Sequence, residues 1–117
     1  MKELEPRLKL WLNCGDAEGA FGDGKWRLLE AVETEGSLRA ASDVLGISYR
    51  KAWGDLRKAE RVLGVRLVDK RRGGRAGGQT ALTAEGKKWL AAYLRFRSEI
   101  QEAVNRAYLK HIRGLVK

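Results

Sequence analysis

A stretch rich in arginine and glycine, "RRGGRAGGQT" at residues 71–80, carries the most distinctive chemistry of this sequence. Its spacing approaches that of a phosphate-binding P-loop, because four residues separate Gly73 from Gly78. Gln79 and Thr80 then stand where the motif requires lysine followed by serine or threonine. The chain is also too short for the α/β sheet that presents such a loop, so the stretch does not indicate a nucleotide site.

The charge around this stretch favours a polyanion as its partner. Residues 50–75 contain ten basic and three acidic side chains, a net charge of +7, whereas residues 1–49 carry a net charge of −3. Residues 76–117 carry a net charge of +5. A concentrated positive block creates a directed field, and nucleic acid offers the densest phosphate charge as its partner. An anionic membrane surface and a glycine-rich turn without any ligand are the two alternatives.

The composition restricts the class of protein. A length of 117 residues suffices for one domain, residues 1–117, around a single hydrophobic core. No apolar run reaches the length of a membrane helix, and the N-terminus "MKELEPRLKL" lacks a signal-peptide core. Cys14 is the only cysteine and cannot form an intramolecular disulfide. We therefore expect a cytoplasmic protein without membrane attachment.

The sequence shows no arrangement that is typical of an enzyme. It contains no Ser-His-Asp set, no paired carboxylates placed for acid–base chemistry and no metal-ligating cluster. His111 is the only histidine and has no second histidine or nearby cysteine with which to share a zinc ion. We expect neither catalysis nor a cofactor nor a metal.

The first half of the chain alternates between strand and helix signals. Apolar and polar residues alternate over residues 8–13, which predicts a half-buried strand, and "AFG" at residues 20–22 could return as a second one. A helix is predicted from Asp23 to about Thr34, with Gly36 as its left-handed C-cap.

Two further helices and a hairpin follow. Ser37 is suited to cap a helix over residues 38–45, and Ser48 a helix over residues 49–63. The second of these has an inward stripe formed by Ala52, Leu56, Ala59 and Leu63. The β-rich residues 65–70 are expected to pair with residues 79–82, which makes the arginine–glycine stretch the loop of a β-hairpin.

The last predicted element is a long helix over residues 83–112. Apolar residues recur on it at alternating steps of four and three: Trp89, Tyr93, Phe96 and Ile100, continued by Ala103 and Ala107. Its length of roughly 45 Å, at 1.5 Å per residue, exceeds what one small domain can cover. We therefore predict that this seam pairs with a second copy of the chain.

The order of these elements, together with four motifs, resembles the DNA-binding domain of the LysR and ModE families of regulators, and ModE more closely. The motifs are "GSL" at residues 36–38, "GISYRKAW" at residues 46–53, the glycine-rich basic residues 72–78 and "LTAEG" at residues 82–86. With the preceding "LKLWLN" and "FGDGKWRLLEAV", the resemblance covers about residues 8–110. It implies an α+β, mainly α fold, namely a winged helix-turn-helix with a short N-terminal strand or hairpin and a long C-terminal dimerisation helix.

The resemblance implies a transcription regulator that binds double-stranded DNA as a homodimer, at an inverted-repeat operator. The second helix of a helix-turn-helix enters the major groove with its N-terminal turn, and a wing contacts the backbone or the minor groove. The expected DNA-binding residues are Ser37, Ser48, Tyr49, Arg50, Lys51, Trp53, Arg57, Arg71, Arg72 and Arg75.

Several roles within this set stay open. Arg50 and Lys51 could contact guanine edges or phosphates, and Trp53 could flank the core or contact a sugar or a thymine methyl group. Gly54 lies in mid-helix, where glycine costs about 1 kcal/mol relative to alanine. Close approach of DNA or of another helix would explain Gly54.

The chain also departs from the family pattern. ModE regulators append a C-terminal domain that binds molybdate, whereas this sequence ends at Lys117, so we do not expect this chain to bind molybdate. Two rival functions remain. A winged helix that binds only protein would not need the charge of residues 50–75, and a peripheral membrane protein would carry its basic residues along an amphipathic helix.

Overall fold

A short antiparallel hairpin begins the fold. The computed structural model describes residues 3–71 and 79–117, and in it β1 (Trp11–Cys14) pairs with β2 (Ala17–Gly22). The predicted alternation is confirmed, because Leu8, Leu10 and Leu12 are half-buried while the residues between them are exposed. The strand was predicted over residues 8–13, but its pairing with β2 begins at Trp11, three residues further along the chain.

Three helices form the centre of the domain: α1 (Asp23–Glu35), α2 (Leu38–Leu45) and α3 (Tyr49–Leu63). Their predicted boundaries are confirmed to within one residue. The Ser37 hydroxyl accepts a hydrogen bond from the Ala40 amide at 3.1 Å, and the Ser48 hydroxyl accepts one from the Lys51 amide at 3.0 Å. Both serines are therefore N-caps, as predicted.

The core lies where these helices meet the two hairpins. Its largest fully buried apolar side chains come from β2, from all three helices and from the start of β3 with the residue before it. They are Phe21, Leu28, Leu29, Val32, Leu38, Leu56, Leu67 and Val68. The predicted inward stripe of α3 is confirmed for Ala52, Leu56 and Ala59, which are each 0% exposed, whereas Leu63 is only half-buried. This packing holds α3 by one side and leaves its other side open.

The second hairpin joins β3 (Val68–Arg71) to β4 (Gln79–Leu82), and α4 (Ala84–His111) follows it. The hairpin and the long helix are both confirmed. Arg72 and Arg75 of the predicted wing lie outside the described residues, as does the side chain of Arg71. A short helical turn, η1 (Arg113–Leu115), follows α4.

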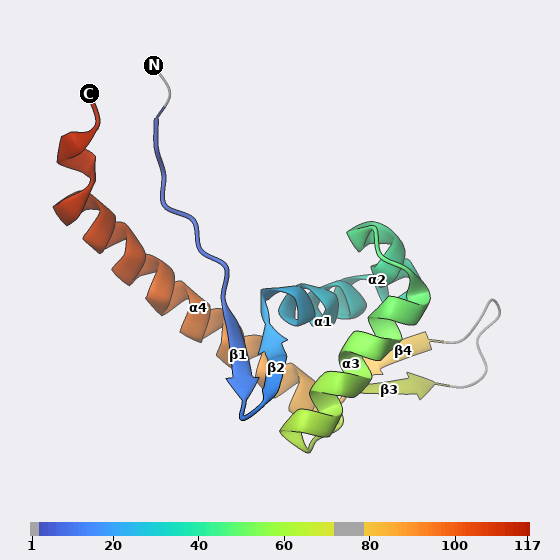
Figure 1. Ribbon diagram of the computed structural model, residues 1–117. Helices are drawn as coiled ribbons and strands as arrows, with labels where there is room; N and C mark the ends of the chain where they lie inside the picture. Colours follow the sequence, from blue (N-terminus) through green and yellow to red (C-terminus); the bar gives the residue numbers. More distant parts are fainter. Residues whose placement is uncertain (1–2, 72–78) are drawn as a thin grey trace.

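Figure 1 shows an elongated molecule in which α4 projects far beyond the three central helices. The extended N-terminal segment runs beside the projecting half of α4, so both ends of the described chain lie at the same end of the molecule. The β3–β4 hairpin points in the opposite direction. Within the described ranges, no helix has both the length and the hydropathy that a membrane span needs.

The predicted interface seam on α4 needs a correction. Tyr93 is 2% exposed and its ring packs against Phe21, with the ring centroids 5.1 Å apart. Trp89 is half-buried and also packs against Phe21, at 5.0 Å. These two residues therefore belong to the core of their own chain, because Phe21 of β2 and Trp26 of α1 pack against this part of α4. Phe96, 41% exposed, and the half-buried Ile100 remain available to a second copy.

Gly86, near the start of α4, lets this helix lie directly against the chain before β3. A Cβ atom at Gly86 would lie 2.1 Å from the carbonyl oxygen of Leu67, and a backbone atom cannot move aside as a side chain can. We expect Gly86→Ala to lower the free energy of unfolding by about 1–3 kcal/mol, the usual cost of overpacking. Urea denaturation checks this, with Gly54→Ala as the matched control, because a Cβ there meets nothing within 4 Å. Equal stability of the Gly86 variant and the wild type would contradict the close approach.

Candidate nucleic-acid interface

The open side of α3 carries basic residues and a glycine. Arg50, Lys51, Arg57 and Arg61 are exposed on it. Gly54 lies among them, and no atom of a described neighbouring element lies within 4 Å of the Cβ that an alanine would place there. Another helix of this chain therefore does not explain Gly54, and the surface around it is accessible to an external partner.

Stacked cations and aromatic rings form a row along one flank of α3. The Arg39 guanidinium of α2 lies 4.3 Å from the ring centroid of Tyr49, and the Tyr49 and Trp53 rings meet edge to face at 6.3 Å. The Arg57 guanidinium lies 4.7 Å from the Trp53 ring centroid, and the Lys70 ammonium of β3 lies 5.8 Å from it. We call Arg39, Tyr49, Trp53, Arg57 and Lys70 the cation–aromatic row.

The row has an energetic and a geometric consequence. A cation within about 6 Å of an aromatic ring centroid gains about 0.5–1 kcal/mol at exposed sites, so the rings hold the charged groups in place. Because the row runs from α2 across α3 to the base of the hairpin, it aligns cations from three elements. The half-buried ring of Trp53 packs against the core, as one of its two predicted roles requires, and it also lies next to two cations, which the sequence did not indicate.

Glu60 connects α3 to the start of the β3–β4 hairpin. Its side chain is 9% exposed and accepts hydrogen bonds from the Leu67 amide at 2.8 Å and the Val68 amide at 3.3 Å. Its other carboxylate oxygen accepts a hydrogen bond from Arg57 at 2.9 Å. The one carboxylate therefore fixes both the start of β3 and a cation of the row.

The two basic residues in the first turn of α3 have different surroundings. Lys51 forms an ion pair with Asp55 at 3.0 Å, one turn further along the helix. Arg50 is exposed and has no ion pair with another described residue. Ser48 is also exposed at the start of the helix, and Ser37 is half-buried at the start of α2. The first turn thus presents one unpaired guanidinium and one partly neutralised ammonium group.

A buried ion pair attaches α4 to the start of α1. The Asp23 carboxylate accepts hydrogen bonds from Arg97 Nε at 2.9 Å, from the Tyr93 hydroxyl at 2.8 Å and from the Leu10 amide at 3.1 Å. Burial alone would raise the pKa of Asp23, but these hydrogen bonds and the charge of Arg97 together hold this pKa below its ordinary value of 3.8. Burial, followed by the hydrogen bond to Asp23, raises the pKa of Tyr93.

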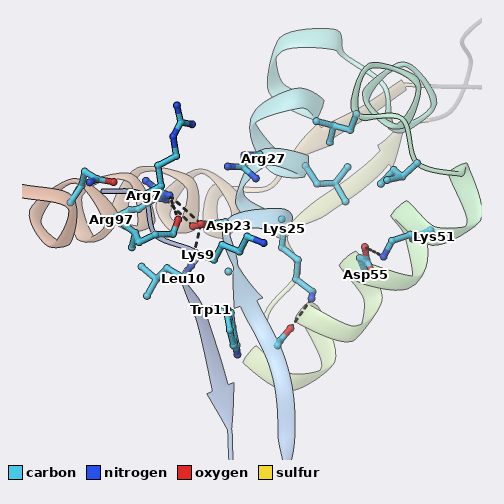
Figure 2. A pocket seen from close by; sticks show the side chains of 18 residues that line it. Arg7, Lys9, Leu10, Trp11, Asp23, Lys25, Arg27, Lys51, Asp55 and Arg97 are labelled. Atoms are coloured by element: carbon cyan, nitrogen blue, oxygen red, sulfur yellow. Dashed lines mark hydrogen bonds and ion pairs between the residues drawn. The ribbon is translucent and has the colours of Figure 1, made fainter. Parts of the chain in front are cut away.

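A groove of about 1080 Å³ lies on the other flank of α3, between that helix, the start of α1 and the N-terminal segment. Figure 2 shows its lining, in which the basic side chains outnumber the acidic ones. The basic residues are Arg7, Lys9, Lys25, Arg27, Lys51 and Arg97. The acidic residues are Asp23 and Asp55, each of which pairs with one of those cations.

Reasoning from the sequence placed Tyr49, Trp53 and Arg57 in the site, and the structure brings these three together in the row. The reasoning from the sequence did not identify Arg39, Lys70 or Glu60 as part of the site. The signal for Arg39 was weak, because one arginine near the start of a helix is ordinary, and its aromatic partner stands ten positions away in the next helix. The ion pair between Asp23 and Arg97 spans 74 positions and leaves no local pattern.

Comparisons with known proteins agree with this architecture. The structure is similar to the protein in "Crystal structure of CbnR_DBD-DNA complex", with a TM-score of 0.61, 23% identity and coverage of 74% of this chain and 94% of that one. It is also similar to that in "Crystal Structure of BenM_DBD/benA site 1 DNA Complex", with a TM-score of 0.59, 23% identity and coverage of 77% and 96%. These similarities confirm the winged helix-turn-helix fold.

Several sequence relatives carry the ModE name, and two of them show the extent of the similarity. "Molybdenum transport protein ModE" from Azotobacter vinelandii is 38% identical over 91 residues, which are 78% of this chain and 34% of that protein. "Transcriptional regulator ModE" from Haemophilus influenzae is 33% identical over 67 residues, which are 57% of this chain and 26% of that protein. The chain thus spans only about a quarter to a third of the length of these two relatives.

The family model described as "Bacterial regulatory helix-turn-helix protein, lysR family" matches residues 24–87, from the start of α1 into the first turn of α4. The match extends over more than half of the sequence, and it includes α2, α3 and both strands of the second hairpin. The chain therefore belongs to the lysR family of bacterial regulatory helix-turn-helix proteins.

Proposed function

We propose that this chain binds double-stranded DNA sequence-specifically and regulates transcription in the manner of the ModE-named relatives. In this proposal the N-terminal turn of α3 enters the major groove, where Ser48, Tyr49 and Arg50 face the DNA. Ser37, at the start of α2, approaches the backbone. The wing residues Arg71, Arg72 and Arg75 contact the backbone or the minor groove.

The cation–aromatic row is the observation that carries this proposal. Arg39, Arg57 and Lys70 come from three different elements, and Tyr49 and Trp53 align them along one flank of α3. A helix that lies in the major groove has a phosphate backbone along its flank, and the cations of the row would face that backbone. Because the aromatic rings already hold these cations in place, binding a phosphate would cost them little side-chain freedom. The exposed Gly54 lets the helix approach the base pairs closely.

The assembly that we infer is a homodimer formed through α4. Beyond Tyr93 the apolar seam continues toward the projecting end of this helix through Phe96, which is 41% exposed, the half-buried Ile100 and the exposed Ala103 and Ala107. A two-fold pair would bury part of this surface and present two recognition helices to one face of the DNA. The operator would then be an inverted repeat whose half-sites lie about one helical turn, or a multiple of it, apart.

Selection of bound fragments from genomic DNA, followed by fluorescence anisotropy on the selected site, tests the proposed function. We expect affinity to fall linearly with the logarithm of salt concentration, with a slope of about −0.9 per phosphate contact. The rival function, a winged helix that binds only protein, predicts no selected site and no binding to any duplex at low salt. That result would contradict DNA binding altogether.

Arg50 and Lys51 should behave differently in the same measurement. Because Arg50 has no ion pair among the described residues, we expect Arg50→Ala to cost about 1–3 kcal/mol on the selected site and less on random DNA. Lys51 is already paired with Asp55, so Lys51→Ala should weaken both duplexes alike and flatten the salt slope by about one unit. Arg95→Ala, an exposed change on α4, is the control. Equal losses on both duplexes for Arg50→Ala would make Arg50 a phosphate contact.

A further inference from the structure

The groove beside α3 is not explained by the contacts proposed so far. It borders the flank of α3 that carries Lys51 and Asp55, whereas the cation–aromatic row follows the flank that carries Tyr49 and Trp53. At 3.6 residues per turn, Trp53 and Lys51 point to nearly opposite flanks of the helix. The groove therefore lies on the side of α3 that is turned away from the wing.

Two exposed cations in this groove have no ion pair with a carboxylate of the described chain. Lys9 of the N-terminal segment and Arg27 of α1 are exposed, and neither forms an ion pair with a described carboxylate. The two lining acids do not compensate for them, because Asp23 is bound to Arg97 and Asp55 to Lys51. Figure 2 shows Lys9 and Arg27 at the walls of the groove, with Lys25 between them and α3.

Lys25 is a half-buried cation in the lining of the same groove. Its ammonium group donates a hydrogen bond to the carbonyl oxygen of Gly19 at 2.7 Å. Burial lowers the pKa of Lys25, and repulsion by Lys58 and Lys51 lowers this pKa further, against the attraction of Asp55. Burial thus disfavours the charge of Lys25 itself, and the excess positive charge that favours an anion in the groove comes from Lys9 and Arg27.

We propose that this groove binds the DNA backbone on the flank of α3 opposite to the wing, with Lys9 and Arg27 as phosphate contacts; this inference rests on the proposed function. A helix with its side chains is about 10–12 Å wide and fills a major groove about 12 Å wide, so a phosphate backbone borders each flank. The row meets one backbone, and the groove meets the other. An open groove of about 1080 Å³ is also far larger than a single small anion requires, which favours a polymer backbone as its occupant.

The N-terminal segment gains a role from this assignment. Lys9 stands between Leu8, whose carbonyl oxygen accepts a hydrogen bond from Arg97 at 3.1 Å, and Leu10, which is bonded to both Asp23 and Tyr93. The backbone on both sides of Lys9 is therefore anchored to α1 and α4. This anchoring holds Lys9 at the groove that Arg27 also lines, although 18 positions separate them in the sequence.

The double variant Lys9→Ala with Arg27→Ala tests the inference on the selected site with its flanking base pairs. We expect the salt slope to flatten by about 1.8 units, the value for two lost phosphate contacts, and affinity to fall about fivefold per contact. The charge-preserving variant Lys9→Arg with Arg27→Lys should restore the slope. Arg95→Ala with Arg106→Ala removes two exposed charges from α4 and serves as the matched control.

Neutral methylphosphonate linkages, scanned along each strand of the duplex, locate the contact. At the positions that the groove covers, they should weaken wild-type binding several-fold and leave binding of the Lys9/Arg27 double variant unchanged. An unchanged salt slope of the double variant, while the wild type still binds the site, would overturn this inference and leave the proposed function standing. Failure of the wild type to bind any duplex would overturn both.

Inorganic phosphate tests whether the groove binds a small free anion instead of the phosphates of a DNA backbone. Thermal unfolding of the wild type and of the double variant should respond equally to millimolar phosphate if the groove serves only a polymer. Stabilisation of the wild type alone, together with an unchanged DNA salt slope, would assign the groove to a small anion and overturn the proposal.

Discussion

Replacement of Asp23 by alanine is expected to lower the free energy of unfolding by about 3–5 kcal/mol, the usual cost of removing one partner from a buried ion pair. Asp23 and Arg97 have side chains that are only 11% and 19% exposed, so the remaining guanidinium has limited access to water. The Tyr93 hydroxyl and the Leu10 amide lose an acceptor at the same time. For a domain whose total stability is about 5–15 kcal/mol, this is a large fraction.

The pH dependence separates the charge of Asp23 from its shape. Because the pKa of Asp23 is lower in the folded protein than its ordinary value of 3.8, folding favours the ionised carboxylate. Its stabilisation is therefore complete above that value and is lost as the pH falls through the folded pKa. The stability difference between the wild type and Asp23→Asn should shrink over this acidic range.

Urea denaturation between neutral and acidic pH measures both effects. Glu33→Ala, an exposed carboxylate on the same helix, is the control and should change stability by no more than about 0.5 kcal/mol. Asp23→Ala combined with Arg97→Met should be less destabilised than the sum of the single changes, because it removes the unpaired cation. A stability difference that does not change with pH would show that the carboxylate charge has no part in this contact.

The substitution of Phe96 and Ile100 by aspartate is expected to give a folded monomer that binds its operator about 10²–10⁴-fold more weakly. The two charges would enter the apolar surface through which we propose that α4 pairs with a second copy. A dimer holds two recognition helices on one DNA, and the loss of this linkage removes the gain from bivalent binding. Binding to an isolated half-site should change little.

Sedimentation equilibrium and anisotropy measure the two effects. Ala91→Asp with Ser98→Asp is the matched control, because both positions are exposed and lie on the opposite face of α4. Phe96 packs 6.0 Å from the Tyr93 ring, so circular dichroism should accompany the measurement. If the variant unfolds, Ala103→Asp with Ala107→Asp tests the same face of α4, because both positions are exposed and continue the seam. A wild type that stays monomeric at tens of micromolar, about the upper range for a weak specific dimer, would contradict the dimer.

Local features of this fold could be predicted from the sequence because their causes are local. Ser37 and Ser48 cap helices through hydrogen bonds to amides three positions away. Gly36 and Gly46 end helices in the left-handed conformation, with φ of +80° and +70°. The inward stripe of α3 follows from helix periodicity alone.

Features that depend on distant partners could not be predicted. The strand that pairs with residues 79–82 was expected at residues 65–70, yet β3 runs from Val68 to Arg71. The backbone of Leu67 is occupied otherwise, since its amide donates to Glu60 and its carbonyl oxygen accepts from Thr83 at 3.0 Å. The apolar period on α4 was recognised correctly, but a period does not reveal whether its partner is the same chain or another. Trp89 and Tyr93 pack within their own chain for that reason.

The hydrogen bonds between the N-terminal segment and α4 have a consequence for how the chain folds. The Tyr93 and Tyr108 hydroxyls and the Arg97 guanidinium reach carbonyl oxygens of Leu10, Leu4 and Leu8, across 83, 104 and 89 positions. Contacts of such long sequence separation must pay the entropy of closing the intervening loop before they stabilise anything, which slows folding. During synthesis, residues 4–10 therefore remain without these partners until most of α4 has left the ribosome. The helix-turn-helix can assemble earlier, from contacts within the middle of the chain.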